Sequence, residues 1–216
     1  MLKRARLSER LLKSLPDYLR DQVGIPEKFV GMVDFELSKN LSPYTTFERG
    51  LCLSGPAGTG KTTSLCLLAK EYYLKQISKN PESIESVWNF NFMADWKFIS
   101  FPKFIMELQD AWRQEKTEDT AFSILSRAAK TKYLIIDDLG AEKLTDYVRQ
   151  ATYYLINERE QWERPTYITT NFSLSQLDEQ FDSRISSRIA GMCDVREIKG
   201  KDLRLTKQHT DATRGI

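Results

Sequence analysis

Five short hydrophobic runs recur along the chain, separated by stretches in which apolar residues follow a different spacing. The best defined run, 133–136, is apolar throughout, contains β-branched residues and is followed by two carboxylates. Runs of this length without alternation are typical of strands that are buried on both faces of a parallel sheet. We therefore predict strands at 49–53, 97–100, 133–138, 166–171 and 194–198.

Between these runs, apolar residues recur every three or four positions, which is the spacing of helices that cover a sheet. The spacing predicts helices after residue 61, at 102–114, from about 117, and at 145–162 with Trp162 facing inward. Strands that alternate with helices indicate an α/β fold. We expect one domain with a mostly parallel five-stranded sheet and helices on both faces.

The N-terminal residues 1–24 combine basic side chains with leucines at helical spacing. Such a basic amphipathic helix either packs its leucines on the core, which we favour, or contacts a partner protein or phosphates. A glycine and a proline at 24–26 end the pattern. We therefore divide the chain into this short basic helix, a core at 25–206 and a polar tail at 207–216.

Composition narrows the classes of function. The 216 residues carry a net charge of only +2, so affinity for nucleic acid must come from a local patch. The three cysteines are widely spaced in apolar surroundings, which suits buried thiols in a reducing compartment better than disulfides or a zinc site. No apolar run is long enough to span a bilayer, and the N-terminus lacks the apolar core of a signal peptide. We expect a cytoplasmic protein.

The stretch 54–63 fits the phosphate-binding loop pattern G-x-x-x-x-G-K-[ST] at every fixed position, between a predicted strand and a predicted helix. Its glycines let backbone N–H groups turn toward phosphate oxygens at the positive end of the helix. Lys61 is expected to reach the outer phosphates and Thr62 to coordinate Mg²⁺. The stretch predicts nucleoside triphosphate binding by Gly55, Pro56, Ala57, Gly58, Thr59, Gly60, Lys61, Thr62 and Thr63.

Asp137 and Asp138 follow the most hydrophobic run. The carboxyl ends of parallel strands form the edge where open α/β folds bind their ligands, so both carboxylates are expected near the phosphates. This arrangement matches a Walker B strand. Asp137 is the expected partner of Mg²⁺, and Asp138 takes the place of a residue that orients or deprotonates the attacking water.

Asn171 stands at the tip of the next predicted strand. If that strand is the neighbour of the Walker B strand, the amide lies beside the γ-phosphate and holds the attacking water. The alternative is that Asn171 caps the helix that follows. The sequence leaves both interpretations open.

Arg184 and Arg188 are four positions apart on a predicted helix, so both lie on one face. They either pair with local carboxylates or project toward the nucleotide of a neighbouring subunit, where an arginine finger stabilises transition-state charge. The aromatic residues in 78–96 present a similar choice. They either pack on their own domain, which we favour, or form a stacking surface for single-stranded nucleic acid.

Taken in order, the motifs resemble those of AAA+ ATPases of the DnaC/IstB type, which include bacterial and phage helicase loaders and transposition helper ATPases. An Asp in the second acidic place of Walker B is particular to this group. The resemblance covers about 25–205. Besides the P-loop, the matching segments are LIIDDLGAEK at 134–143, RPTYITTN at 164–171, RISSRI at 184–189 and GKDLR at 200–204.

The resemblance implies an AAA+ P-loop ATPase without a C-terminal helical lid. It implies that Lys61 and Thr62 belong to Walker A, Asp137 and Asp138 to Walker B, and Asn171 to sensor 1. The chain is then expected to bind ATP and Mg²⁺ and to hydrolyse ATP slowly unless a neighbouring subunit supplies an arginine.

The resemblance further implies an ATP-dependent homo-oligomer in which Arg184 or Arg188 is the arginine finger; which of the two is left open. The segment 102–116 is expected to line a groove for single-stranded DNA, with Lys103, Arg113 and Lys116 as candidate contacts. Arg204 is a further candidate contributor to the nucleotide site. Members that load helicases usually carry a separate N-terminal region for gripping the helicase, and here only the short basic helix precedes the core.

The partner implied by the resemblance is a replicative helicase, in a bacterial or phage-encoded replication system, or alternatively a transposase. Two other classes of function also fit a P-loop. One is a small-molecule kinase, which would need an arginine-bearing lid over the phosphate acceptor. The other is a nucleotide-dependent binding module in which hydrolysis is incidental.

Overall fold

The computed structural model of the chain describes residues 2–31, 47–84, 95–113 and 120–203. At its centre is a five-stranded sheet in the order β2-β3-β4-β1-β5, with every neighbouring pair parallel. The α/β fold with a parallel sheet is therefore confirmed. The strands are β1 (Gly50–Ser54), β2 (Trp96–Ser100), β3 (Tyr133–Leu139), β4 (Thr166–Thr170) and β5 (Cys193–Glu197).

The strand order places β4 between β1, which leads into the P-loop, and β3, which carries the two carboxylates. The parallel register pairs Leu53 of β1 with Thr169 of β4. Between β3 and β4 the register shifts after Ile136 and resumes at Leu139. The irregular stretch therefore coincides with Asp137 and Asp138.

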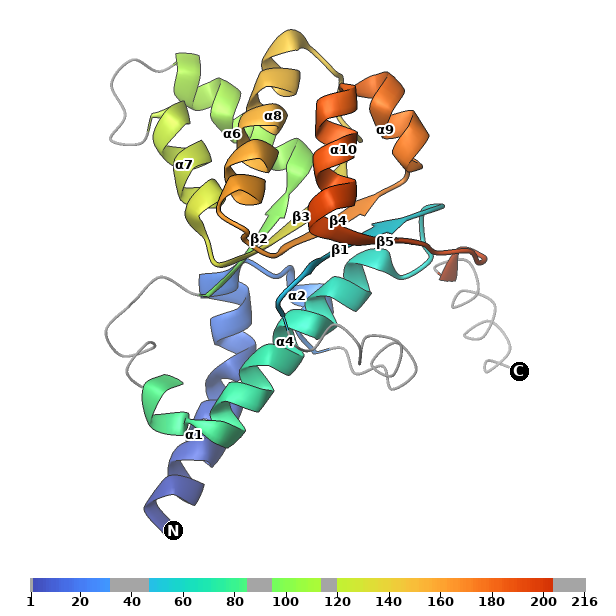
Figure 1. The fold of residues 1–216 in the computed structure, drawn as a ribbon. Helices are drawn as coiled ribbons and strands as arrows, with labels where there is room; N and C mark the ends of the chain where they lie inside the picture. The colour runs from blue at the N-terminus through green and yellow to red at the C-terminus, as the bar shows by residue number, and fades with distance from the viewer. Residues whose placement is uncertain (1, 32–46, 85–94, 114–119, 204–216) are drawn as a thin grey trace, which may run out of the picture.

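Helices cover both faces of the sheet (Figure 1). On one face lie α1 (Leu2–Tyr18), the π-helical turn η1 (Leu19–Val23), α2 (Glu27–Val30) and α4 (Lys61–Lys79). Leu11 and Leu15 of α1 are buried in the core cluster that includes α4. The N-terminal helix therefore packs these two leucines on the domain, as the favoured interpretation predicted, while Leu12 is exposed.

The second helical layer covers the opposite face (Figure 1). Its core cluster joins Cys52, Ile136 and Ile168 of the central strands to the apolar faces of these helices. Parallel strands buried by two helical layers are expected to be apolar on both sides, which explains their unbroken hydrophobic runs. The layer consists of α6 (Phe101–Arg113), α7 (Ala121–Lys130), α8 (Asp146–Gln161), α9 (Leu174–Gln180) and α10 (Ser183–Met192).

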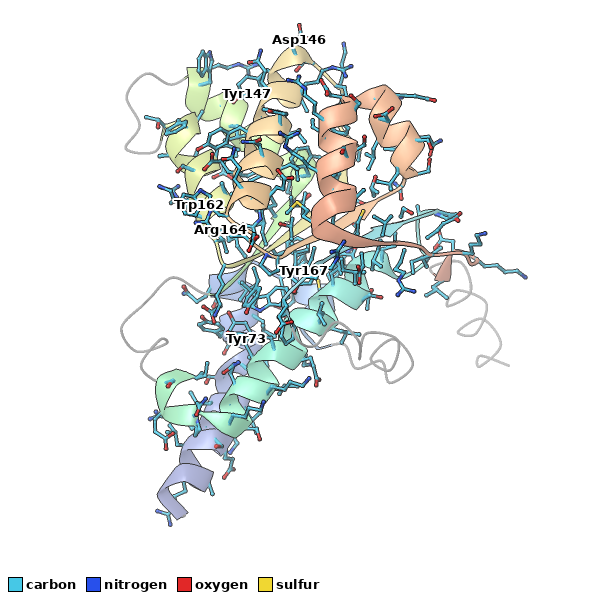
Figure 2. The ribbon with its side chains drawn as sticks, viewed as in Figure 1. Tyr73, Asp146, Tyr147, Trp162, Arg164 and Tyr167 are labelled. Atoms are coloured by element: carbon cyan, nitrogen blue, oxygen red, sulfur yellow. The ribbon has the colours of Figure 1, made fainter. Side chains whose placement is uncertain are left out.

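Two details of the predicted helices need correction. The described part of α7 begins at Ala121 with Thr120 as its N-cap, whereas the predicted start near 117 lies outside the described residues. Trp162 was predicted to face inward, and this was wrong because its side chain is 65% exposed. It follows the last residue of α8, and the guanidinium of Arg164 lies 5.6 Å from its ring (Figure 2).

A fully buried arginine joins the end of α7 to α8 and β4. Arg159 has no exposed surface, and its guanidinium donates hydrogen bonds to one hydroxyl and several main-chain carbonyls. Burial lowers its pKa to about 9, so it remains charged at neutral pH. The acceptors are the hydroxyl of Thr166 and the carbonyls of Ala128, Ala129, Thr131, Lys132 and Pro165.

The cysteines are as predicted: Cys52, Cys66 and Cys193 are free thiols in the buried core. None of the helices in the described ranges combines the length and the apolar character that a membrane span requires.

Candidate functional site

The P-loop connects β1 to α4, and three of its glycines adopt backbone angles that other residues rarely tolerate. Gly55, Gly58 and Gly60 have φ values of 132°, 77° and 88°. A Cβ on Gly55 would collide with the carbonyl of Ile198, and one on Gly58 with the carboxylate of Asp202. The glycines are therefore required both by the curl of the loop and by the segment packed against it.

Lys61, the first residue of α4, is buried to 6% exposure at the heart of the site. Its ammonium donates to the carbonyls of Gly55 and Pro56, both at 2.7 Å, and to Oδ1 of Asn171 at 3.0 Å. The structure thus brings the predicted Walker A lysine and sensor asparagine into direct contact. An ammonium held at the mouth of a curled glycine loop suits a phosphate ligand.

Thr62 and Asp137 form the predicted magnesium pair. The Thr62 hydroxyl donates to Oδ1 of Asp137 at 2.7 Å, and the Thr169 hydroxyl donates to the same oxygen at 2.8 Å. Burial raises the pKa of Asp137, while both hydroxyl bonds favour its charged form. One carboxylate and one hydroxyl fit Mg²⁺, which keeps several waters and takes oxygens from substrate phosphates.

No group of three or more His, Cys, Asp or Glu side chains in the described ranges could hold a metal ion by itself. A metal ion that depends on a nucleotide for part of its shell needs no such protein cage. The donor set therefore fits Mg²⁺ brought by a triphosphate.

Asp138 is exposed at the carboxyl edge of the sheet, next to the buried Asp137. Its φ of 59° lies in the left-handed region, which is unusual for a residue other than glycine. Its backbone N–H donates to the Thr169 hydroxyl at 2.9 Å. The turn after Asp137 therefore sends the second carboxylate out of the sheet, where it is able to meet water.

Asn171 does not cap the following helix. The N-cap of α9 is Ser173, whose hydroxyl accepts from the N–H of Gln176, while the Gln176 side chain accepts from the N–H of Ser173. The amide of Asn171 instead accepts from Lys61. The capping interpretation is therefore wrong.

Arg184 and Arg188 lie on one face of α10, as predicted, and both are close to the Tyr153 ring of α8. Their guanidinium carbons lie 4.7 and 5.1 Å from the centre of that ring. Arg184 makes a bidentate pair with Asp182 at 2.8 and 2.9 Å, and its side chain remains 63% exposed. This pair lowers the pKa of Asp182 to about 2.

Arg188 is more enclosed than Arg184, with 24% of its side chain exposed. It donates to Oδ1 of Asn157 at 3.1 Å and pairs with Glu160 at 3.3 Å. Within one subunit both arginines therefore make the local contacts of the first interpretation. An intersubunit role remains a proposal.

The candidate DNA contacts are spread along α6. Lys103 is exposed in its first turn, and Arg113 in its last turn pairs with Asp110 at 3.5 Å. Lys116 and Arg204 lie outside the described residues. So does 85–94, most of the aromatic segment, although Trp96 at its end is fully buried in β2.

Three features of the site were missed from the sequence. Thr169 joins the carboxylate of Asp137 to the backbone N–H of Asp138, and its place in a Thr-Thr-Asn strand end is the only hint of it. Both carboxylate oxygens of Glu142 are buried, and this burial raises the pKa of the group. The segment 198–203 packs against the P-loop. The N–H of Ile198 donates to the carbonyl of Ser54, and the N–H of Leu203 donates to the carbonyl of Gly58.

Comparison with known proteins agrees with this geometry. No protein-family model matches the chain. Over 154 residues the chain is 28% identical to the replicative helicase loader DnaI of Bacillus subtilis (strain 168). The match covers 71% of this chain and 42% of DnaI, so the chain spans less than half of that relative.

Solved structures share the fold. The crystal structure of the DnaC helicase loader has a TM-score of 0.57 and 23% identity, covering 74% of this chain and 87% of that chain. The crystal structure of DnaI has a TM-score of 0.60 and 21% identity, covering 81% and 94%. The replication initiator DnaA bound to AMPPCP and single-stranded DNA has a TM-score of 0.54 and 15% identity, covering 83% and 50%. The chain therefore shares the α/β P-loop fold of these structures, and its predicted resemblance to proteins of the DnaC type is confirmed.

Proposed function

We propose that the chain is a Mg²⁺-dependent ATPase that assists DNA replication by acting on a replicative helicase. The observation that carries this proposal is the meeting of three motifs at one edge of the sheet. Thr62 lies 2.7 Å from Asp137, and Lys61 lies 3.0 Å from Asn171. Walker A, Walker B and the sensor position come from separate parts of the chain, so their convergence supports one catalytic site.

In the proposed reaction, water attacks the γ-phosphorus of ATP, and the bond from that phosphorus to the bridging oxygen of ADP breaks. Lys61 and the loop N–H groups bind the phosphate oxygens. Thr62 and Asp137 would hold Mg²⁺, and a bound Mg²⁺ would supply positive charge beside the phosphates. The exposed Asp138 orients the water and accepts its proton. Asn171 fixes the water or senses the γ-phosphate from the neighbouring strand.

A helicase partner is supported by the similarity to a replicative helicase loader, DnaI. Because the chain matches only 42% of that relative, the segment that grips the helicase must be found by experiment. Single-stranded DNA is the proposed nucleic-acid ligand, with Lys103 and Arg113 as contacts on α6. We further propose that the protein acts in the bacterial cytoplasm, encoded by the host or by a phage.

Full activity is proposed to need a homo-oligomer. Arg184 and Arg188 stand together on α10, with Arg184 largely exposed. In an assembly one of them would exchange its local carboxylate for the phosphates bound by the next subunit, since an arginine finger of this kind raises rates by about 10³–10⁵. Before assembly, the ion pairs with Asp182 and Glu160 would keep the two arginine side chains oriented on α10.

The proposal is tested by measuring phosphate release and sedimentation with and without single-stranded DNA, at two salt concentrations, together with capture of a purified replicative helicase. We expect Mg²⁺-dependent phosphate release without any added acceptor, and DNA stimulation that weakens as salt rises. Lys103→Ala with Arg113→Ala should reduce the DNA response and leave basal hydrolysis unchanged, whereas Lys79→Ala should change neither. The replication role would be contradicted if DNA did not change the rate of ATP hydrolysis and the protein did not bind the helicase.

A further inference from the structure

Strand β4 lies between the P-loop strand and the Walker B strand, and one of its side chains links the parts of the site. Thr169 is fully buried on this strand, next to Leu53 of β1 in the register. Asn171, two residues further along, meets Lys61. From β4, Thr169 reaches the carboxylate of Asp137 on β3.

The Thr169 hydroxyl makes two hydrogen bonds with opposite roles. It donates to Oδ1 of Asp137 at 2.8 Å and accepts from the backbone N–H of Asp138 at 2.9 Å. A hydroxyl has a single O–H donor, so both bonds form together only when the hydrogen points at Asp137. The group is thus fully oriented by its two neighbours.

The first bond fixes the carboxylate expected to face the metal ion. Thr62 at the start of α4 and Thr169 of β4 donate to the same oxygen, Oδ1 of Asp137. Two donors on one oxygen define the rotation of the carboxylate about its side-chain bond. They also offset part of the cost of burying its charge.

The second bond fixes the backbone that carries the other carboxylate. The β3–β4 register shifts at this point, and the N–H of Asp138 is bonded to the Thr169 hydroxyl. Asp138 has a left-handed φ of 59°, a conformation that costs a non-glycine residue about 1 kcal/mol or more. The hydroxyl therefore stabilises the strained turn that sends the Asp138 side chain out to solvent.

We propose that Thr169 is a positioning residue that couples the two Walker B carboxylates: one hydroxyl orients the side chain of Asp137 and holds the backbone of Asp138. This inference rests on the proposed ATPase function and adds a residue to it. Thr169 touches neither nucleotide nor water in this scheme. Removal of the Thr169 hydroxyl should therefore leave nucleotide binding without Mg²⁺ unchanged. It should weaken nucleotide binding with Mg²⁺ and slow the turnover that depends on Asp138.

The test compares Thr169→Val, which keeps the shape and removes the hydroxyl, with Thr169→Ser, which keeps the hydroxyl. Affinity for a fluorescent ATP analogue is measured with EDTA and with Mg²⁺, and turnover is measured separately. For Thr169→Val we expect the affinity in EDTA to be unchanged. The factor by which Mg²⁺ increases the affinity should fall about tenfold, and kcat should fall by more than KM changes. Thr169→Ser should recover most of both effects.

Thr152→Val is the matched control, because Thr152 is also fully buried but its hydroxyl bonds only within α8 among the contacts described, to the carbonyl of Val148. It should leave the Mg²⁺-dependent gain unchanged. If Thr169→Val does not fold, Thr169→Cys replaces it, since a thiol of similar size is a weak donor and a weak acceptor. The inference would be overturned if Mg²⁺ increased the nucleotide affinity of the folded variant as much as that of the wild type. It would also be overturned if the variant lost affinity equally in EDTA and in Mg²⁺.

The failure of the proposed function gives a different result. In that case the wild-type protein itself would show no Mg²⁺-dependent gain in affinity and no phosphate release. A wild-type protein that binds and hydrolyses Mg²⁺-ATP, beside a Thr169→Val variant that does so equally well, would remove the coupling role alone.

Discussion

The ammonium of Lys61 lies 3.0 Å from Oδ1 of Asn171, although 110 residues separate them in the chain. They meet because β4 pairs directly with β1 and both strands end at the same edge of the sheet. The same ammonium also bonds the carbonyls of Gly55 and Pro56. A phosphate oxygen that approaches Lys61 must therefore compete with protein acceptors, one of which is Asn171.

Removal of the lysine should weaken nucleotide binding. Lys61→Ala deletes a charge-assisted contact to the phosphates, each worth about 1.5–3 kcal/mol, so we expect ATP affinity to fall at least about tenfold. Isothermal titration with ATP and Mg²⁺ measures this. Lys75→Ala on the same helix, which removes only an exposed pair with Glu71, should bind normally. Intact binding by Lys61→Ala would disprove the P-loop assignment.

The sensor asparagine should matter more for turnover than for binding. Asn171→Ala removes an amide that contacts Lys61 and lies where the attacking water is expected, so kcat should fall by roughly 10²-fold, as when a preorganised polar group is deleted from a reactive site. ATP affinity should change much less. Steady-state kinetics beside equilibrium binding separates the two. If Asn171→Ala bound ATP weakly but had a normal kcat, Asn171 would serve binding and not turnover, contrary to our assignment.

The intersubunit role of the α10 arginines is open to a mixing experiment. Lys61→Ala subunits lack a working loop, and Arg184→Ala/Arg188→Ala subunits lack the proposed finger, so each should be nearly inactive alone. In an equal mixture, an intact loop meets an intact arginine at up to about a quarter of interfaces, and ATPase activity should return to that extent. Activity that never returns would place both arginines in a structural role. Single substitutions then identify the finger.

Stability should depend on pH through Glu142. Burial raises its pKa in the folded state, so folded molecules bind more protons than unfolded ones between the ordinary and the raised pKa. The free energy of unfolding contributed by this group is therefore lost as pH rises through that window. Glu142→Gln should match the wild type at low pH and become relatively more stable above it, as measured by urea denaturation across pH. The exposed Glu179→Gln should show no such trend.

The buried guanidinium of Arg159 should be a major source of stability. Arg159→Met keeps much of the apolar volume and leaves several buried carbonyls without donors, at about 1–3 kcal/mol for each group left unsatisfied. We expect a loss of about 3 kcal/mol or more in the free energy of unfolding, measured by chemical denaturation. Arg6→Met at an exposed position of α1 should cost less than about 0.5 kcal/mol. Similar losses for both variants would contradict this account.

The sequence was sufficient to predict the sheet, both helical layers and the meeting of Lys61, Thr62 and Asp137. These follow from local patterns whose geometry is fixed: a glycine loop between strand and helix, and an apolar strand that ends in carboxylates. The position of Trp162 was predicted wrongly because helical spacing gives a face but not the point where the helix ends. One more turn of helix would have turned that ring toward the core.

Other parts of the site depend on contacts that no local pattern encodes. Thr169 matters because β4 lies beside β3 with a shifted register, and strand order is not written in the sequence of either strand. Glu142 looks like any loop carboxylate until the packing around it is known. The arginines of α10 have the predicted spacing, but a role toward a neighbouring subunit comes from contacts between subunits and not from the spacing.

The segment 198–203 that leans on the P-loop has a consequence for how the protein is made. Ile198 and Leu203 bond to Ser54 and Gly58, so the loop reaches its full set of contacts only when nearly the whole domain has been synthesised. Synthesis proceeds from the N-terminus, at about 5–20 residues per second. In a nascent chain that has emerged only as far as Walker A, the loop would therefore lack these contacts, and it would gain them once residues 198–203 have been made.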